Sequence, residues 1–378
     1  MLDPRFPGGH LVPPLFPAAV YPYPDLESLD RAMAGSSPGV FYARDAHPNG
    51  DQLAAKLTAL EGGQWGRVTG SGMAALVAAV LPFVRHGDRV VASDQLYGKS
   101  ALWLRNELTR FGVAVEFVNT CNLDAVRQSL TVPARFVFAE TISNPLLHVA
   151  DLDALADIAR KAGARLIVDN TFASPILCRP LERGAALVQE SLTKIIGGHC
   201  DLTLGYVGGT DAADAKPVVA ATSTWGLTAG PFDCWLALRS LETLSLRVKA
   251  ASTNAAELAE RLDKLPGIAR VIYPGRTDHP DHALAMKLLP DGCGAMLSFE
   301  LAGGRDAAIE FLRKSGVPLC PSLGHSGTTI SYPAATSHRG MTREERARLG
   351  VTDGLLRVSV GLEPVTEVMS RLRAGNNP

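Results

Sequence analysis

Short apolar runs alternate with helical patterns between residues 46 and 230. In segment 151–163 apolar side chains recur at helical spacing, and Asp151 is placed to cap this helix and Gly163 to end it. A further helix is predicted at 72–84, and strands are predicted at 89–92, 114–118, 135–139 and 165–168. Strands that alternate with helices are typical of βαβ units, so we expect an α/β domain built on a mainly parallel sheet flanked by helices.

The arrangement of apolar and polar residues differs before and after residues 46–230. After residue 231, a long helical pattern at 233–265 precedes strand-like runs at 266–275, 295–301 and 355–363. This order predicts a smaller α+β domain over 231–378. Residues 1–45 are rich in proline, glycine and aromatic residues and lack clear periodicity, so we expect an extended arm that lies over another surface rather than folding alone.

Composition narrows the class of protein. Of 378 residues 46% are hydrophobic and 20% charged, which excludes a mainly disordered chain. With 37 basic and 38 acidic residues the net charge is -1, so we expect no broad nucleic-acid surface. The most apolar run, Met73–Val84, is too short to span a membrane. Six cysteines form no C-x-x-C pair and the N-terminus does not resemble a secretory signal, so we expect a cytoplasmic protein.

Two motifs carry candidate chemistry at predicted strand and helix ends. TGSGMAAL (69–76) places glycines before an apolar helix, whose first N–H groups could bind a phosphate; an ordinary turn is the alternative. RLIVDNT (165–171) is an apolar strand that ends in Asp169. Groups at such strand ends line the ligand crevice of open α/β sheets, although Asp169 could equally cap a helix.

Two further motifs follow the same logic. ETISNP (140–145) would bring Glu140 and Asn144 to the same sheet edge, unless it is only a turn. In SLTKIIGGH (191–199), the hydroxyl residues Ser191 and Thr193 lie next to Lys194 in the sequence. Lys194 is either a surface lysine or a nucleophilic amine in partly apolar surroundings. Taken together, a phosphate cradle, a carboxylate and an amine fit one ligand, pyridoxal 5'-phosphate.

With these motifs, the chain resembles the Cys/Met-metabolism family of pyridoxal-phosphate enzymes, the group of cystathionine γ-synthase, cystathionine γ-lyase and methionine γ-lyase. The resemblance covers about residues 13–363 and implies the fold-type-I transferase architecture. It rests on motifs that occur in this order: TGSGMAAL, LYGKS, ETISNP, VDNTFASP, SLTKIIGGHCD, SLGH and LLRVSVGLE.

The resemblance implies a role for each matching residue. Lys194 corresponds to the Schiff-base lysine and proton carrier, Tyr97 to the catalytic tyrosine that stacks on the cofactor ring, and Asp169 to the partner of the ring nitrogen. Other matching residues would bind the cofactor: Gly72, Met73, Glu140, Asn144, Thr171, Ser191 and Thr193.

The remaining matches concern the substrate and the assembly. Arg357 fits a clamp for the substrate α-carboxylate, and Ser322 lies in the segment that shapes the substrate pocket. Tyr42 and Arg44 resemble a pair that reaches the cofactor phosphate of a neighbouring subunit. The family therefore implies a homotetramer in which two subunits share each active site.

Several positions depart from the family pattern. Lys99 stands where methionine γ-lyases usually carry cysteine, and Gly327 stands where many γ-acting members carry glutamate. His325 is interpreted as a loop residue or a partial substitute for that polarity, and Cys200 as a small buried packing residue rather than a reactive thiol. The spacing of TDHPDH (277–282) occurs in some metal sites, but we interpret it as a solvated loop and expect no metal.

These features predict a pyridoxal-phosphate lyase that catalyses γ-elimination on cystathionine or a related γ-substituted amino acid. Cystathionine γ-synthase or acylhomoserine sulfhydrylase activity, both γ-replacements, is the first alternative. A fold-type-I aminotransferase or decarboxylase is the second. A cofactor-binding protein without catalysis is the third, and the intact set of site residues argues against it.

Overall fold

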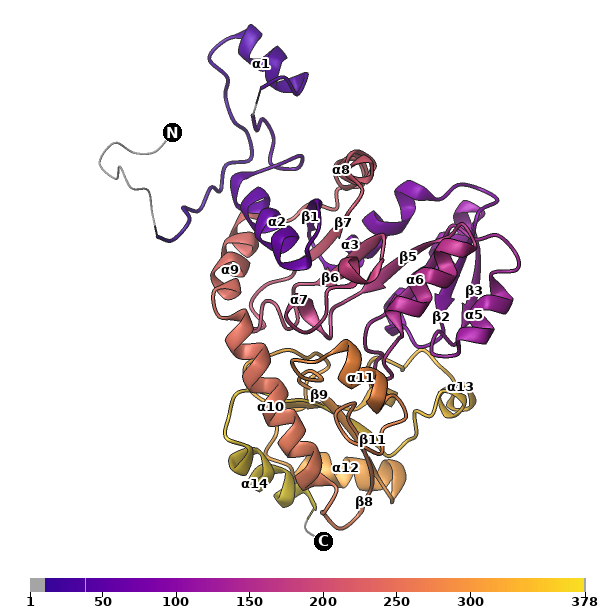
Figure 1. Ribbon diagram of the computed structural model, residues 1–378. Helices are drawn as coiled ribbons and strands as arrows, with labels where there is room; N and C mark the ends of the chain where they lie inside the picture. Colours follow the sequence, from indigo (N-terminus) through magenta and orange to yellow (C-terminus); the bar gives the residue numbers. More distant parts are fainter. Residues whose placement is uncertain (1–10, 38, 377–378) are drawn as a thin grey trace.

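The computed structural model describes residues 11–37 and 39–376. Its larger sheet has seven strands in the order β1-β7-β6-β5-β4-β2-β3 (Figure 1). Strands β2 to β6 pair in parallel, and β7 runs antiparallel to both β6 and β1. The strands are β1 Trp65–Thr69, β2 Arg89–Ser93, β3 Ala114–Val118, β4 Phe136–Glu140, β5 Arg165–Asp169, β6 Leu187–Ser191 and β7 Gly205–Gly209.

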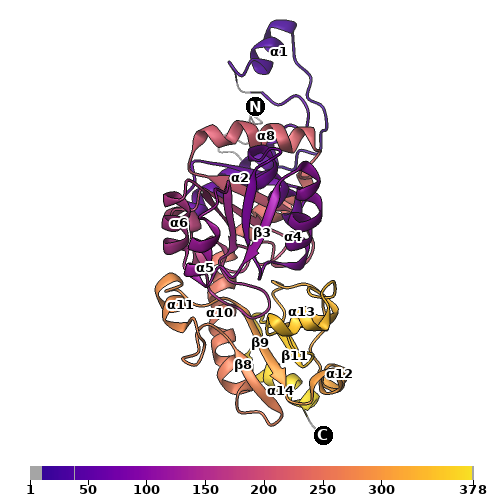
Figure 2. The ribbon, with the colours of Figure 1, turned by 90° about the vertical axis from the view of Figure 1, so that its right-hand side faces the viewer.

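Both faces of this sheet are buried. In β4, Val137 packs into one hydrophobic cluster, whereas its neighbours Phe136 and Phe138 pack into another on the opposite face. Figure 2 shows α4 and α6 on opposite sides of the sheet. The flanking helices are α2 Pro48–Glu61, α3 Gly72–Val80, α4 Gly98–Leu102, α5 Leu123–Ser129, α6 Leu152–Lys161, α7 Ser174–Leu177 and α8 Ala215–Thr224. Continuous apolar strands such as β4 are typical of a doubly covered parallel sheet.

The second sheet has four antiparallel strands in the order β10-β11-β9-β8. Its strands are β8 Ile268–Ile272, β9 Met296–Leu301, β10 Thr329–Ser331 and β11 Leu355–Ser359. The helices of this half are α9 Pro231–Leu241, α10 Leu244–Leu262, α11 His282–Leu288, α12 Gly304–Lys314, α13 Arg343–Arg348 and α14 Val365–Asn376. Helix α9 packs against α2, whereas α10 contacts β8 and β9, so the α9–α10 pair connects the two sheets (Figure 1).

The predicted α/β architecture and its elements are confirmed, with local differences. Asp151 caps α6 by accepting a hydrogen bond from the Ala154 N–H (3.0 Å). Helix α3 ends at Val80, and a 3₁₀ turn at Leu81–Phe83 follows because Pro82 lacks the N–H that would continue the α-helix. The pattern at 233–265 is two helices rather than one, α9 and α10.

The N-terminal segment projects away from the body of the molecule (Figures 1 and 2). It contains one helix that the weak periodicity did not predict, α1 Leu26–Met33, capped by Asp25. Residues 1–10 of the predicted arm lie outside the described residues. The domain boundaries at 45 and 230 stay predictions. Among the described helices, none combines the length and the hydropathy needed to cross a membrane.

Candidate active site

Three neighbouring parallel strands end on polar residues. Glu140 closes β4, Asp169 closes β5 and Ser191 closes β6. Glu140 and Asp169 are direct partners in the β4–β5 register, and the Thr171 hydroxyl accepts a hydrogen bond from the Ser191 N–H (2.9 Å). Parallel strands present their carboxyl ends at one sheet edge, so these groups from distant motifs are brought together.

Asp169 is a carboxylate without a cationic partner. Its Oδ1 accepts a hydrogen bond from the Thr171 N–H (2.9 Å), and the Gln189 side chain also bonds it. Burial raises its pKa despite these hydrogen bonds. No ion pair joins it to a lysine or arginine of the described chain. A protonated ring nitrogen would supply the missing positive charge, so this position fits the pyridine ring of pyridoxal phosphate.

Glu140 holds the backbone of Tyr97 in place. Its Oε1 accepts a hydrogen bond from the Tyr97 N–H (2.6 Å), and Tyr97 directly precedes α4. Burial, followed by the charge of Asp169, raises the Glu140 pKa well above its usual value. Tyr97 is 41% exposed.

Lys194 lies in the turn after β6 with its amine in a partly apolar setting. Burial first and the charge of Arg357 second lower its pKa. Its Nζ donates a hydrogen bond to Ser322 Oγ (2.8 Å). A lowered pKa raises the fraction of neutral amine, which is the form that bonds an aldehyde carbon or accepts a proton.

Arg357 lies on β11 and is a buried cation with neutral partners. Its Nη1 donates to Asn144 Oδ1 (2.7 Å) and its Nη2 to the Ser322 carbonyl (3.1 Å), while Nε has no partner. Burial lowers its pKa to about 10. Because a buried guanidinium is stabilised by a carboxylate, the unused donor and missing counter-charge suit an anionic ligand group.

The helix start at Gly72 is packed directly on Ser191. A Cβ at Gly72 would lie 2.6 Å from Ser191 Cβ, so glycine is required for this approach. Gly72 and Met73 form the first turn of α3, whose N-terminal N–H groups lie beside Ser191 and fit a phosphate. The Thr193 hydroxyl makes two hydrogen bonds with the backbone of Leu204. It donates to the Leu204 carbonyl (3.3 Å) and accepts from the Leu204 N–H (3.1 Å).

Tyr42 and Arg44 are not brought to these groups within one chain. Arg44 Cζ lies 4.9 Å from the centroid of the Tyr42 ring, and its Nε lies 3.7 Å from Asp45 Oδ1. In the described part of the chain, no hydrogen bond or ion pair links either residue to Lys194 or Asp169.

Sequence reasoning missed two residues that support the site. Gln189 interrupts the apolar strand β6, and that irregularity could have indicated its bond to Asp169. Arg247, buried on α10, donates to the carbonyls of Ile195 (2.7 Å) and Ile196 (2.9 Å) in the turn after Lys194. No local pattern distinguishes Arg247 from a surface arginine, because its acceptors are about 50 residues away in sequence.

Two minor expectations are wrong. Cys200 is exposed rather than buried, in a turn where its φ is +58°. His279 is 6% exposed rather than solvated, because the segment after β4 that carries Leu146 and His148 packs against it. His325 lies in a loop, and its Nδ1 accepts a hydrogen bond from the Gly327 N–H (2.9 Å).

Comparison with known proteins gives the context of this geometry. Residues 4–376 match the profile of the family described as "Cys/Met metabolism PLP-dependent enzyme". The chain is 36% identical to L-methionine gamma-lyase of Pseudomonas putida (97% of this chain, 93% of the relative). It is 37% identical to cystathionine gamma-lyase of Bacillus subtilis (93% and 92%). Cystathionine gamma synthase of Xanthomonas oryzae pv. oryzae, solved in complex with cystathionine, superposes with a TM-score of 0.92 at 36% identity (98% and 93%).

Proposed function

Because the chain belongs to the Cys/Met-metabolism family of pyridoxal-phosphate-dependent enzymes, we propose that it cleaves cystathionine or a related γ-substituted amino acid by γ-elimination. The fold-type-I architecture, the cofactor and the enzyme class predicted from sequence are confirmed by these matches. The observation that supports the site assignment most strongly is that Lys194, Asp169 and Arg357 are linked through their neighbours. The charge of Arg357 acts on both Lys194 and Tyr97. The Tyr97 N–H is in turn hydrogen-bonded to Glu140, the register partner of Asp169.

Different residues of the chain would carry out different parts of the reaction. Pyridoxal phosphate, when bound, supplies an electron-accepting ring that stabilises negative charge on the substrate Cα. Arg357 would bind the α-carboxylate of the substrate with the donors that now reach Asn144 and Ser322. Lys194 Nζ would accept the Cα proton, and a second proton would then leave Cβ so that the γ-substituent can depart. Burial keeps this amine a better proton acceptor than an exposed lysine at neutral pH.

Two neighbours would assist these proton movements. Ser322 Oγ, 2.8 Å from Lys194 Nζ, orients the amine toward the substrate. The Tyr97 hydroxyl would donate a proton to the departing γ-sulfur, because burial raises its pKa and keeps it protonated. Asp169, supported by Gln189, would hold a proton on the ring nitrogen, and the cofactor phosphate would lie between Gly72 and Ser191.

The γ-replacement alternative has its own support. The match to a cystathionine gamma synthase is as close in sequence as the match to the lyases. The two reactions share the groups that activate Cα and expel the γ-substituent, and they differ in whether water or a thiol completes the reaction. Supplying an acylated homoserine together with cysteine, and comparing cystathionine formed with 2-oxobutyrate formed, separates them.

We also propose a cytoplasmic homotetramer, built from two dimers in which the two subunits share active sites. The support is the N-terminal segment, which projects from the body of the molecule (Figure 1). Tyr42 is 41% exposed, and within the described chain no hydrogen bond joins it to Lys194. Mixing a Lys194→Ala chain with a Tyr42→Phe chain tests this. Restored activity in the mixture supports a shared site, and a mixture no more active than its components contradicts it.

The catalytic assignment is tested with Lys194→Ala and a matched control, Lys99→Ala. Lys99 lies on α4 near the same crevice but is exposed and has no role in the proposed proton transfers. We expect Lys194→Ala to abolish turnover of L-cystathionine and to lose the visible absorption of lysine-bound cofactor. Turnover by Lys194→Ala comparable with that of Lys99→Ala would contradict the assignment.

A further inference from the structure

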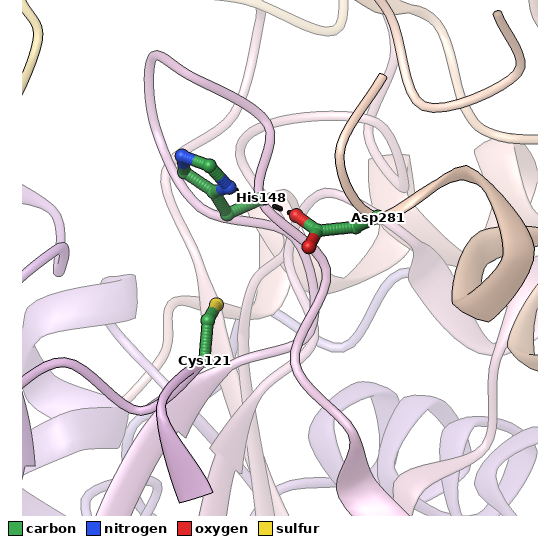
Figure 3. Close-up of side chains that lie close together, drawn as sticks. All are labelled: Cys121, His148 and Asp281. Carbon is green, nitrogen blue, oxygen red and sulfur yellow. Dashed lines mark hydrogen bonds and ion pairs between the residues drawn. The ribbon is translucent and has the colours of Figure 1, made fainter. Parts of the chain in front are cut away.

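A cluster of metal-ligating side chains lies outside the proposed active site. Cys121 follows β3, His148 lies between β4 and α6, and Asp281 directly precedes α11 (Figure 3). One potential ligand atom from each lies within 4.8 Å of the other two. His148 Nδ1 and Asp281 Oδ2 are hydrogen-bonded at 2.8 Å, and the Cys121 thiol donates weakly to the Val149 carbonyl (3.8 Å).

The charges around this cluster favour a cation. Asp281 Oδ2 also accepts a hydrogen bond from the Val149 N–H (3.2 Å). Asp94 adds a second carboxylate close to Cys121, and its Oδ1 is buried with no hydrogen-bond partner among the described residues. Over the described ranges, no lysine or arginine forms an ion pair with Asp281 or Asp94. The carboxylates of Asp281 and Asp94 therefore give the cluster negative charge that a divalent cation would offset.

A nucleophilic cysteine is the other chemistry that these three residue types suggest. Nucleophilic thiols have a lowered pKa, because the thiolate is the reactive species. Here burial, followed by the charges of Asp281 and Asp94, raises the pKa of Cys121 to about 12. This environment therefore argues against a nucleophilic role for Cys121.

We propose that Cys121, His148 and Asp281 form a binding site for a divalent metal ion of the zinc type. One sulfur, one imidazole nitrogen and one carboxylate oxygen are ligands typical of Zn²⁺, and water would take the fourth position of a tetrahedral site. The three residues are only partly buried, so an ion can enter from solvent. This proposal replaces the expectation that the chain binds no metal.

Binding would proceed with a defined proton balance. The Cys121 thiol loses one proton as the metal–sulfur bond forms, and Asp281 binds as its carboxylate. The ring proton of His148 moves from Nδ1 to Nε2, so Nδ1 can bind the ion. The present hydrogen bond between His148 and Asp281 is thereby exchanged for two bonds to the ion. The ion would then join the segment before α11 to the carboxyl-terminal side of the larger sheet.

The experiment uses the purified holoenzyme, stripped of adventitious metal with a chelator and titrated with Co²⁺. Cobalt reports thiolate ligation through a sulfur-to-metal charge-transfer band, and competition with Zn²⁺ then gives the zinc affinity. We expect one ion per chain, about one proton released per ion and a higher Tm with metal. The variants are Cys121→Ser, His148→Gln and Asp281→Asn, and Cys200→Ser is the control because it removes an exposed thiol outside the cluster.

Loss of a group that merely orients a ligand typically weakens metal affinity by about 10- to 100-fold, so loss of a ligand should weaken it at least as much. The charge-transfer band should vanish in Cys121→Ser and persist in Cys200→Ser. The proposal is overturned if the wild-type chain binds no ion, if the three variants bind as tightly as wild type, or if Cys200→Ser removes the band. Asp281→Asn keeps the size of its side chain, so it tests the site even where another variant fails to fold.

Discussion

Replacement of Arg357 by lysine is the sharpest test of the carboxylate clamp. The guanidinium uses two Nη donors, one to Asn144 and one to Ser322, and it has no carboxylate partner in the described chain. Lysine keeps the positive charge but offers a single point of contact instead of a fork. Arg357→Lys therefore separates the geometry of the clamp from its charge.

The expected loss of activity follows from the number of hydrogen bonds that the substitution removes. A hydrogen bond to a charged group contributes about 1.5–3 kcal/mol, and lysine would forfeit one of the two that a bidentate carboxylate receives. That energy corresponds to a fall of about 10- to 150-fold in kcat/KM. Because the carboxylate is bound both before and during the reaction, most of the loss should appear as a higher KM rather than a lower kcat.

The assay is steady-state cleavage of L-cystathionine by holoenzyme whose cofactor content is matched by absorbance. Arg313→Lys is the control, since it makes the same chemical change on the exposed face of α12, where Arg313 pairs only with Glu310. The clamp is refuted if Arg357→Lys and Arg313→Lys have the same KM, or if kcat falls while KM is unchanged.

Two further predictions follow from packing and burial. Gly72→Ala should weaken retention of the cofactor and destabilise the fold by about 1–3 kcal/mol, because the added Cβ would lie 2.6 Å from Ser191 Cβ. The control is Gly230→Ala, whose added Cβ would meet no atom within 4 Å. Equal cofactor loss from both variants would count against a phosphate site at Gly72. Glu61 and Glu190 are buried carboxyls whose negative charges repel each other. Burial raises the pKa of Glu61 to about 7 and that of Glu190 well above its usual value. The stabilising contribution of Glu61 is therefore complete below the unfolded value of 4.5 and is lost as pH rises through about 7. Glu190→Gln should therefore flatten the fall in Tm between pH 4.5 and 8, and an unchanged pH slope of Tm would show that the pair does not control it.

The sequence predicted those parts of the molecule whose causes are local. The apolar run before Asp169 and the capped helix after Asp151 depend on nearby residues, and both are present where expected. The motif order also indicated which strand ends carry chemistry. Because parallel strands align their carboxyl ends, Glu140 and Asp169 could be expected at one edge before any coordinates were known.

The features that escaped prediction depend on contacts between distant segments. Cys121, His148 and Asp281 come from three separate segments, and no spacing in the chain connects them. Arg247 supports the turn after Lys194 from a helix about 50 residues away. The exposure of Cys200 is decided by a turn with positive φ, which no apolar pattern reveals. Such features follow from tertiary packing, which a periodicity argument does not contain.

The central claim is γ-elimination, and the most direct measurement is mass-spectrometric identification of the products formed from L-cystathionine by the cofactor-loaded enzyme. The proposed roles of Lys194, Tyr97 and Arg357 predict cysteine, 2-oxobutyrate and ammonia. Homocysteine with pyruvate would mean that the β-substituent leaves instead, and no cleavage at all would remove cystathionine as a substrate. Either result would contradict the account.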